Sequence, residues 1–157
     1  MHKKLILDQK QIEIILKRFC HQLIENHDVF ENTVLLGLQP RGPLVLDKLV
    51  LLLEEISGIK VPFGYLDATF HRDDFRRRDL PLKANETKIN FLIEGKNVIL
   101  VDDVLYKGRS VRAAMDAMIA FGRPNKVELL ILIDRKYSRE LPIEADYVGR
   151  AVNTLPT

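Results

Sequence analysis

The segment that most constrains how this chain folds covers residues 98–110 and reads VILVDDVLYKGRS. Its first four residues are apolar and rich in β-branched side chains, which predicts a strand that is buried on both faces. Two aspartates follow this strand at once, and a short glycine-containing loop then leads into a helix that opens at Ser110. Because a helix start favours an anion, this combination of strand, carboxylates, loop and helix predicts a ligand site.

Apolar patterns in the rest of the chain predict an alternation of strands and helices. Asp8 suits the N-cap of a helix whose apolar positions recur at spacings of three and four, from Ile12 to Leu23. Further helices are predicted at residues 43–57 and 110–122, and strands at residues 33–38, 61–66, 98–101 and 127–133. Such alternation predicts an α/β fold with a mostly parallel, Rossmann-like central sheet flanked by helices, with ligands at the carboxyl ends of the strands.

A long charged excursion at residues 67–93 interrupts this alternation. Between Arg72 and Asp79 the sequence holds four arginines and three aspartates, so this stretch cannot be a buried strand. Residues 89–93 are expected to return as a strand of a hairpin-like excursion. We interpret the excursion as a flap or hood on a single domain that spans residues 1–157, because this length leaves no room for a second full domain.

The composition narrows the functional classes. With 46% hydrophobic residues, 29% charged residues and a net charge of +2, the chain is typical of a globular protein, and its total charge does not indicate a nucleic-acid binder. The single cysteine, Cys20, excludes an internal disulfide and is expected to pack in the core. No leader or membrane-spanning stretch is apparent, so a cytoplasmic protein without a membrane partner is expected.

The adjacent carboxylates Asp102 and Asp103 need a physical reason at the end of a buried strand, because like charges repel. A divalent cation or hydroxyl donors make such a pair tolerable, as a Mg²⁺-bound sugar diol does. The alternative interpretation is that the aspartates merely cap turns. A phosphoacceptor receiver domain also pairs acidic residues after a strand, but there the pair ends the first strand, whereas here it lies two-thirds along the chain.

The loop after the carboxylates has the composition of a phosphate-binding loop. Gly108 permits tight backbone curvature, and Ser110 can both cap the helix and donate its hydroxyl to a phosphate. Lys107 and Arg109 add positive charge. Since the carboxylates lie only a few residues away, one sugar phosphate can span both features, with its hydroxyls on the aspartates and its phosphate on the loop. The alternative is a loop that only connects strand and helix.

Residues 98–110 resemble the phosphoribosyl pyrophosphate (PRPP) motif of type I phosphoribosyltransferases. The segments ILVDDVLYKGRSVRAAMDAM, FGRPNKVELLILIDR and RELPIEADYVG are similar to the PyrR family of pyrimidine operon attenuators and uracil phosphoribosyltransferases. With weaker similarity around LGLQPRG and FHRDD, the resemblance covers nearly the whole chain. It implies the type I phosphoribosyltransferase fold and transfer of phosphoribose from PRPP to uracil, which gives UMP and pyrophosphate and requires Mg²⁺ as cofactor.

The same resemblance implies roles for individual residues. Catalytic roles are implied for Asp102 and Asp103, with an indirect Mg²⁺ site near them, and for Arg41 and Arg72, which hold the leaving pyrophosphate. Catalysis would then rest on positioning and on electrostatic stabilisation of the leaving group, without a nucleophilic side chain. The residues implied to bind PRPP or nucleotide are Val104, Leu105, Tyr106, Lys107, Gly108, Arg109, Ser110 and Gly42.

Several of these assignments have plainer alternatives. Arg41 and Gly42 can equally form an ordinary turn, and residues 76–78 of the flap can be solvated arginines. The base is expected near Asp134 and Arg135, beyond the predicted strand at 127–133, although these two residues can also form a surface ion pair.

The chain departs from the family pattern at several positions. Lys107 and Pro40 stand where the family commonly has threonine, so pyrophosphate handling is expected to differ in detail. Where RNA-regulating members usually read DRGHRELPIRADY, this chain reads DRKYSRELPIEADY, and Glu144 replaces a basic residue. A carboxylate opposes contact with an RNA backbone. RNA is therefore a less favoured partner than the nucleobase.

Three functional hypotheses follow from the residues and the resemblance. The leading one is a uracil phosphoribosyltransferase with PRPP, uracil or UMP, and pyrophosphate as ligands, assembled as a homodimer or a higher homo-oligomer. The second is an RNA-binding regulator of pyrimidine gene expression that responds to uridine nucleotides. The third is a phosphoribosyltransferase for another base, because the PRPP motif specifies the sugar donor and not the acceptor.

Overall fold

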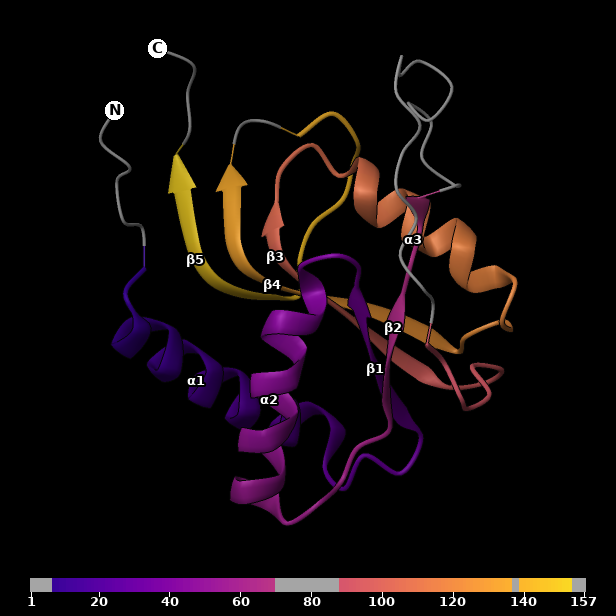
Figure 1. Ribbon diagram of the computed structural model, residues 1–157, viewed down its shortest axis with the longest axis horizontal. Coiled ribbons are helices and arrows are strands. Elements are labelled where there is room, and N and C mark those ends of the chain that lie inside the picture. The colour runs from indigo at the N-terminus through magenta and orange to yellow at the C-terminus, as the bar shows by residue number, and fades with distance from the viewer. Residues whose placement is uncertain (1–6, 70–87, 137–138, 154–157) are drawn as a thin grey trace.

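The centre of the computed structural model is a five-stranded parallel sheet with the strand order β2-β1-β3-β4-β5 (Figure 1). The structure describes residues 7–69, 88–136 and 139–153. The strands are β1 (Thr33–Leu38), β2 (Phe63–Leu66), β3 (Asn97–Leu105), β4 (Lys126–Lys136) and β5 (Tyr147–Asn153). The helices are α1 (Gln9–His27), α2 (Gly42–Ser57) and α3 (Arg109–Ile119). The predicted α/β class with a parallel sheet flanked by helices is thereby confirmed.

The helices cover both faces of the sheet, with α1 and α2 on one face and α3 on the other (Figure 1). Alternation along β3 sends Ile99 and Val101 into the core under α1 and α2, and Val98 and Leu100 into the core under α3. All four side chains are buried, which explains why this strand is a continuous apolar run.

The first helix follows its sequence signals closely. The side chain of Asp8 accepts a hydrogen bond from the backbone N–H of Gln11 at 2.8 Å, and the Gln11 side chain accepts one from the N–H of Asp8 at 2.9 Å, which completes a capping box. Cys20 is fully buried, as predicted, and burial raises the pKa of its thiol to about 11. This thiol is therefore a packing group of the core.

Strand lengths differ from the sequence-based predictions. The strand predicted at residues 98–101 continues to Leu105, and the one predicted at 127–133 continues to Lys136. Asp102 therefore lies inside β3, opposite Ile131 of β4, and does not follow the strand. The reason is that parallel pairing is a backbone ladder, which continues past the last apolar side chain. By contrast, β2 begins at residue 63 and not at 61.

Two further predictions are corrected, and one strand was missed. The helix after the glycine loop begins at Arg109 with Gly108 as its N-cap, and no side chain caps it, so Ser110 is a residue of the first turn and not a cap. Residues 89–93 form no strand, because Ile93 packs into the core while only Lys88 bridges to Tyr65 of β2. The strand β5 was not predicted at all.

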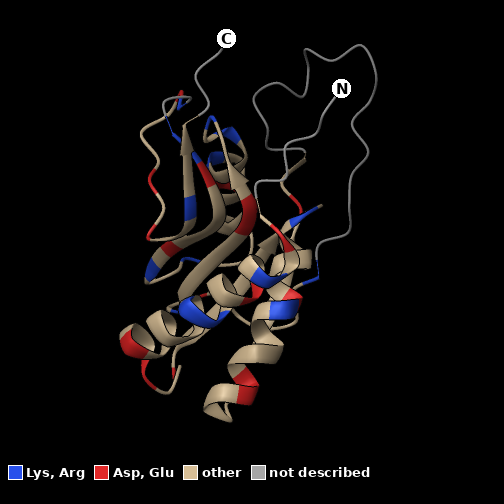
Figure 2. Ribbon diagram, turned by 90° about the vertical axis from the view of Figure 1, so that its left-hand side faces the viewer, with Lys and Arg blue, Asp and Glu red and all other residues tan. Residues whose placement is uncertain are grey.

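The charged part of the predicted flap, residues 70–87 with Arg72, lies outside the described residues. Within the described residues, none of the helices is long and apolar enough to cross a lipid bilayer. Acidic and basic residues are intermixed along α1 and α2 (Figure 2). This part of the surface therefore offers no extended basic face for a polyanion.

Candidate functional site

The predicted site residues of the described segments gather at the carboxyl ends of β1, β3 and β4. These strands run parallel, so their last residues meet at one edge of the sheet (Figure 1). Asp102 and Asp103 lie three and two residues before the end of β3. Each carboxylate accepts a hydrogen bond from the next backbone N–H, at 2.8 Å from Asp103 and at 2.7 Å from Val104. The carboxylates are thus held against their own strand.

The two carboxylates line different hollows. Asp102 lies on the α3 side of the sheet, in a cavity with the residues that follow β3, whereas Asp103 lies in a second hollow on the α1 and α2 side with Arg41. Because successive strand residues face opposite sides of a sheet, this split follows from their position inside β3. The sequence prediction, which placed both carboxylates after the strand, did not include it.

Asp102 has an unusual electrostatic environment. Its pKa is raised to about 8, first because burial disfavours the charged form and next because the charge of Asp103 is close by. The Arg41 guanidinium acts in the opposite direction and is the weaker influence. A buried carboxyl beside a second one gains most from a ligand that brings hydroxyl donors or a cation.

Residues 106–110, which link β3 to α3 and include the first two residues of that helix, are named the phosphate loop below. It forms a cavity of about 140 Å³ together with the end of β3 and the first turn of α3. The lining residues are Asp102, Val104, Leu105, Tyr106, Lys107, Gly108, Arg109, Ser110 and Val111. Every loop residue predicted to bind PRPP therefore lies around one small cavity that also contains Asp102.

Gly108 determines the shape of this loop. Its φ of 93° lies in the left-handed region that side chains rarely adopt, and it serves as the N-cap of α3. A Cβ at this position would lie 3.3 Å from Cδ1 of Ile143. The turn brings the first N–H groups of α3 to the cavity, and no side chain of the described residues caps this helix start. Uncapped N–H groups at a helix start favour an anion.

The two loop cations are already paired with Glu140, a residue that the sequence analysis did not single out. The carboxylate of Glu140 lies 3.1 Å from Nζ of Lys107 and 2.6 Å from Nη2 of Arg109. These contacts, with that to Arg109 first, lower the pKa of Glu140. Glu140 lies 31 residues beyond Arg109 in the sequence, and so long a separation leaves no local pattern to reveal the pair.

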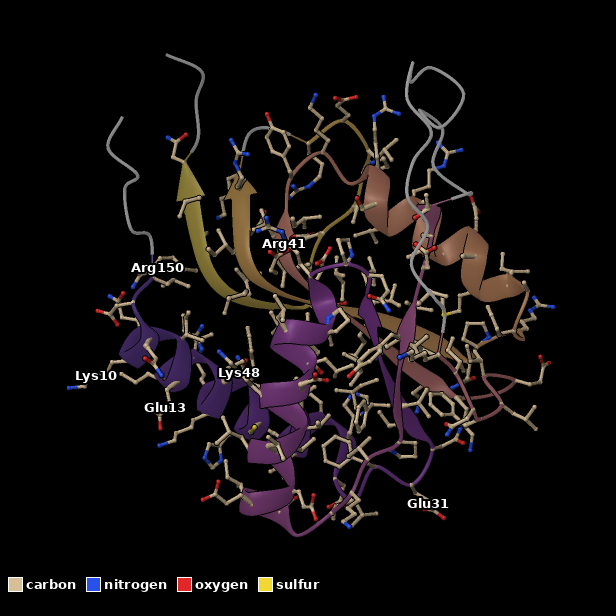
Figure 3. The ribbon with its side chains drawn as sticks, viewed as in Figure 1. Lys10, Glu13, Glu31, Arg41, Lys48 and Arg150 are labelled. Atoms are coloured by element: carbon tan, nitrogen blue, oxygen red, sulfur yellow. The ribbon has the colours of Figure 1, made fainter. Side chains whose placement is uncertain are left out.

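Arg41 lies at the end of the turn between β1 and α2, beside the end of β3 (Figure 3), and Gly42 is the first residue of α2. Nη1 of Arg41 lies 3.7 Å from Oδ2 of Asp103, and its side chain is 75% exposed, so most of it remains accessible to a ligand. Close packing requires glycine at position 42, because a Cβ there would lie 2.5 Å from the carbonyl oxygen of Val101. This contact brings the turn against β3.

The two residues expected near the base contact different neighbours. Asp134 lies in β4, is 6% exposed, and accepts a hydrogen bond of 2.7 Å from Nη2 of Arg139. The Arg135 guanidinium stacks on the ring of Tyr106, 3.9 Å from its centroid. The end of β4 is therefore joined to the phosphate loop, and Arg139 is a second residue that the sequence analysis missed.

The described residues contain no cluster of three or more His, Cys, Asp or Glu side chains that can hold a metal ion. Asp102 and Asp103 supply two carboxylates. Mg²⁺ is often bound by one or two protein carboxylates together with substrate oxygens and water. This donor set therefore fits Mg²⁺ only where a substrate provides the remaining oxygens.

Comparisons with known proteins identify the family of this chain. The family profile described as "Phosphoribosyl transferase domain" matches residues 2–155. The "Bifunctional protein PyrR" of Haemophilus ducreyi is 44% identical over 154 residues, which is 97% of this chain and 84% of the relative. The "Bifunctional protein PyrR" of Caldicellulosiruptor bescii is 44% identical over 96% of this chain and 82% of the relative.

Solved structures match the fold. A hypoxanthine phosphoribosyltransferase from Staphylococcus aureus superimposes with a TM-score of 0.73 at 20% identity, over 96% of this chain and 78% of that one. The hypoxanthine phosphoribosyltransferase of Trypanosoma cruzi gives a TM-score of 0.75 at 15% identity, over 96% and 82%. The sequence and fold comparisons together lead to one conclusion. This chain belongs to the phosphoribosyl transferase domain family, and within it to the PyrR proteins.

Proposed function

We propose that this protein transfers the phosphoribosyl group of PRPP to uracil, giving UMP and pyrophosphate. The observation that carries the proposal is the cavity that joins Asp102 to the phosphate loop and the start of α3. Its two ends suit the two ends of a ribose 5-phosphate, a carboxylate for hydroxyls and N–H groups for the phosphate. Identity of 43–44% to proteins named "Bifunctional protein PyrR" supports a pyrimidine base as acceptor.

The proposed reaction requires that the protein position the two substrates, and it does not require a nucleophilic side chain. The bond between C1 of the ribose and the pyrophosphate oxygen breaks, N1 of uracil forms the new bond at C1, and the N1 proton is released. Positive charge develops on the sugar and negative charge on pyrophosphate. In this proposal Asp102 and Asp103 orient the ribose, while Arg41 and the turn at Gly42 hold the leaving group.

Mg²⁺ is the proposed cofactor of this reaction. When bound with PRPP, it neutralises charge on the phosphates and on the carboxylates that face them. Its proposed site is an indirect one near Asp102 and Asp103, where oxygens of the substrate would link the ion to these carboxylates. The raised pKa of Asp102 supports the assignment, because a carboxyl that is costly to ionise alone gains from a cation.

The remaining roles complete the proposal. The base is proposed to lie near Asp134 and Arg135, next to Tyr106 of the phosphate loop. Arg72 is proposed to close over pyrophosphate as part of a flap at residues 67–93, which would exclude water and limit hydrolysis of PRPP. Residues 1–157 are proposed to act as one domain within a homodimer or a higher homo-oligomer.

A panel of acceptors tests the proposal. Purified protein is incubated with PRPP, Mg²⁺ and one base at a time from uracil, cytosine, hypoxanthine, guanine and adenine, and the nucleotides are separated. We expect UMP as the main product. A nucleotide from hypoxanthine or guanine alone would replace the uracil assignment by a purine one, and no nucleotide from any base would contradict the enzyme.

A second function, RNA-binding regulation, is favoured by one observation, the word "bifunctional" in the names of the relatives. Against it, Glu144 places an exposed carboxylate where RNA-regulating relatives usually carry a basic residue. The regulator predicts binding to a defined RNA hairpin that UMP strengthens and salt weakens. Equal affinity for a scrambled RNA of the same length would exclude it.

A further inference from the structure

We propose that Arg139 is a positioning residue that holds the phosphate loop against the end of β4 and thereby sets the affinity for the sugar phosphate donor. This inference rests on the proposed function, because it concerns the same site. The inference goes beyond the proposed function because it assigns a role to Arg139, a residue that does not line the cavity of the phosphate loop.

The guanidinium of Arg139 joins three separate segments. Nη2 donates to Oδ1 of Asp134 in β4 at 2.7 Å, Nε donates to the carbonyl oxygen of Ile143 at 2.9 Å, and Nη1 donates to the carbonyl oxygen of Tyr106 in the phosphate loop. The Arg139 side chain is 21% exposed and that of Asp134 is 8% exposed. A fixed fork of donors suits three acceptors in this way, whereas the single ammonium of a lysine does not.

The backbone beside Arg139 strengthens the same connection. The N–H groups of Glu140 and Leu141 both donate to the carbonyl oxygen of Lys107, at 3.0 and 3.3 Å. Cδ of Arg139 also lies 3.5 Å from the position that a Cβ on Gly108 would take. The loop therefore has the substrate cavity on one side and the segment from Arg139 onward on the other.

Arg139 acts on the loop by geometry rather than by attracting phosphate. Its charge is paired with the buried carboxylate of Asp134, so little of that charge reaches a ligand. Without the guanidinium, the Tyr106 carbonyl loses its donor and the N–H groups at the start of α3 lose their fixed orientation. Small displacements of such groups are costly for binding.

The test compares Arg139→Met and Arg139→Lys with the wild type. PRPP affinity is measured by calorimetry with Mg²⁺, kcat and the KM for PRPP are measured with uracil, and thermal unfolding reports the fold. We expect Arg139→Met to raise the dissociation constant and the KM for PRPP about tenfold or more, with a smaller change in kcat. Arg139→Lys keeps a charge for Asp134, so this variant should stay folded. Its dissociation constant and KM for PRPP should lie between those of the wild type and of Arg139→Met.

The matched control is Arg18→Met. Arg18 also uses its guanidinium to bind backbone, with Nη2 at 3.0 Å from the carbonyl oxygen of Val148 and at 2.6 Å from that of Gly149. It lies on α1, away from the phosphate loop, so its loss should lower stability without changing the KM for PRPP.

Each outcome separates this inference from the proposed function. Wild-type PRPP affinity in Arg139→Lys or in folded Arg139→Met overturns the positioning role and leaves the enzyme intact. A defect that disappears at high salt also overturns it, because that result would indicate direct attraction of phosphate. A wild-type protein that binds no PRPP contradicts the proposed function itself. A salt-independent rise in the PRPP dissociation constant supports the inference.

Discussion

The guanidinium of Arg109 donates two hydrogen bonds to Oε2 of Glu140, at 3.1 Å from Nε and at 2.6 Å from Nη2. Nζ of Lys107 lies 3.1 Å from the other oxygen of the same carboxylate. Lys107, just before α3, and Arg109, the first residue of α3, thus both have a partner within the protein. A phosphate in the cavity of the loop must either rely on the N–H groups at the helix start or compete with Glu140 for the two cations.

Replacing Glu140 by glutamine should therefore strengthen phosphate binding. Glu140→Gln keeps the size of the side chain and removes the charge that neutralises Lys107 and Arg109, so we expect a several-fold lower KM for PRPP with a steeper dependence on salt. Steady-state kinetics at two ionic strengths measures both. The control is Glu144→Gln, which removes the same charge from an exposed residue four positions further along.

An unchanged or higher KM for PRPP in Glu140→Gln would mean that Glu140 serves the loop by holding its cations in place. An equal decrease in both variants would attribute the effect to net charge alone. Only a decrease confined to Glu140→Gln supports competition at the loop.

Asp102→Asn should stabilise the protein without ligands while it abolishes turnover. The pKa of Asp102 is raised to about 8 in the folded protein. The protonated carboxyl therefore favours the folded state. This stabilisation is complete below the pKa that Asp102 has in the unfolded chain and is lost as the pH rises through about 8. Above that pH, the charged form destabilises the fold. We expect Asp102→Asn to raise the free energy of unfolding by roughly 1–2 kcal/mol at about pH 9 and by less at about pH 5.

Urea denaturation at the two pH values measures this difference, without PRPP or Mg²⁺. Asp116→Asn, an exposed change on α3, is the matched control and should have little effect at either pH. Equal stability of Asp102→Asn and the wild type at the higher pH would show that burial does not penalise this carboxylate.

Much of the fold could be predicted because the responsible signals are local. The N-cap at Asp8 and the apolar run of β1 depend on neighbouring residues and appear at the predicted places, and α2 begins one residue before its predicted start. The strand β5 could not be predicted in this way. Its sequence YVGRAVN lacks a continuous apolar run, and it forms because β4 offers a partner ladder along its whole length.

The site shows the same division between local and distant information. The phosphate loop and Asp102 lie within nine residues of each other, and the cavity includes every residue predicted from that segment except Asp103, which lines the hollow with Arg41. Arg139 and Glu140 were missed because their partners lie 33 and 31 residues away, in Tyr106 and Arg109. Only the pairing of β3 with β4 brings these segments together.

Gly108→Ala should damage both stability and donor binding, in contrast to Gly58→Ala. Both glycines have positive φ, 93° and 74°, so alanine should cost about 1–2 kcal/mol of unfolding free energy at either place. At Gly58 nothing lies within 4 Å of the new Cβ, whereas at Gly108 it meets Ile143 at 3.3 Å. We therefore expect a higher KM for PRPP only in Gly108→Ala. Equal kinetics in the two variants would contradict a role of this turn in binding.

Tyr147→Phe should destabilise the protein without affecting the reaction. The Tyr147 hydroxyl donates to Glu128 at 2.8 Å, and Glu128 also binds Nε2 of His27 at 2.5 Å, in a buried network at the amino ends of the strands. Losing the hydroxyl leaves a buried carboxylate oxygen without that donor, which should cost about 1–3 kcal/mol of unfolding free energy. Urea denaturation measures the loss, and kcat and KM should stay unchanged.

The control for this change is Tyr65→Phe, which removes an exposed hydroxyl that donates to Asp47 at 2.5 Å. That loss should stay within about 0.5 kcal/mol. A similar cost for both tyrosines would mean that burial of the Glu128 network adds nothing to stability.

The measurement that tests the central claim most directly follows UMP and pyrophosphate together, from PRPP, uracil and Mg²⁺. It compares the wild type with the double variant Asp102→Asn/Asp103→Asn, after circular dichroism has established that both are folded. We predict equimolar UMP and pyrophosphate from the wild type and neither product from the double variant. Equal rates in the two proteins, or no UMP from the wild type, would contradict the account.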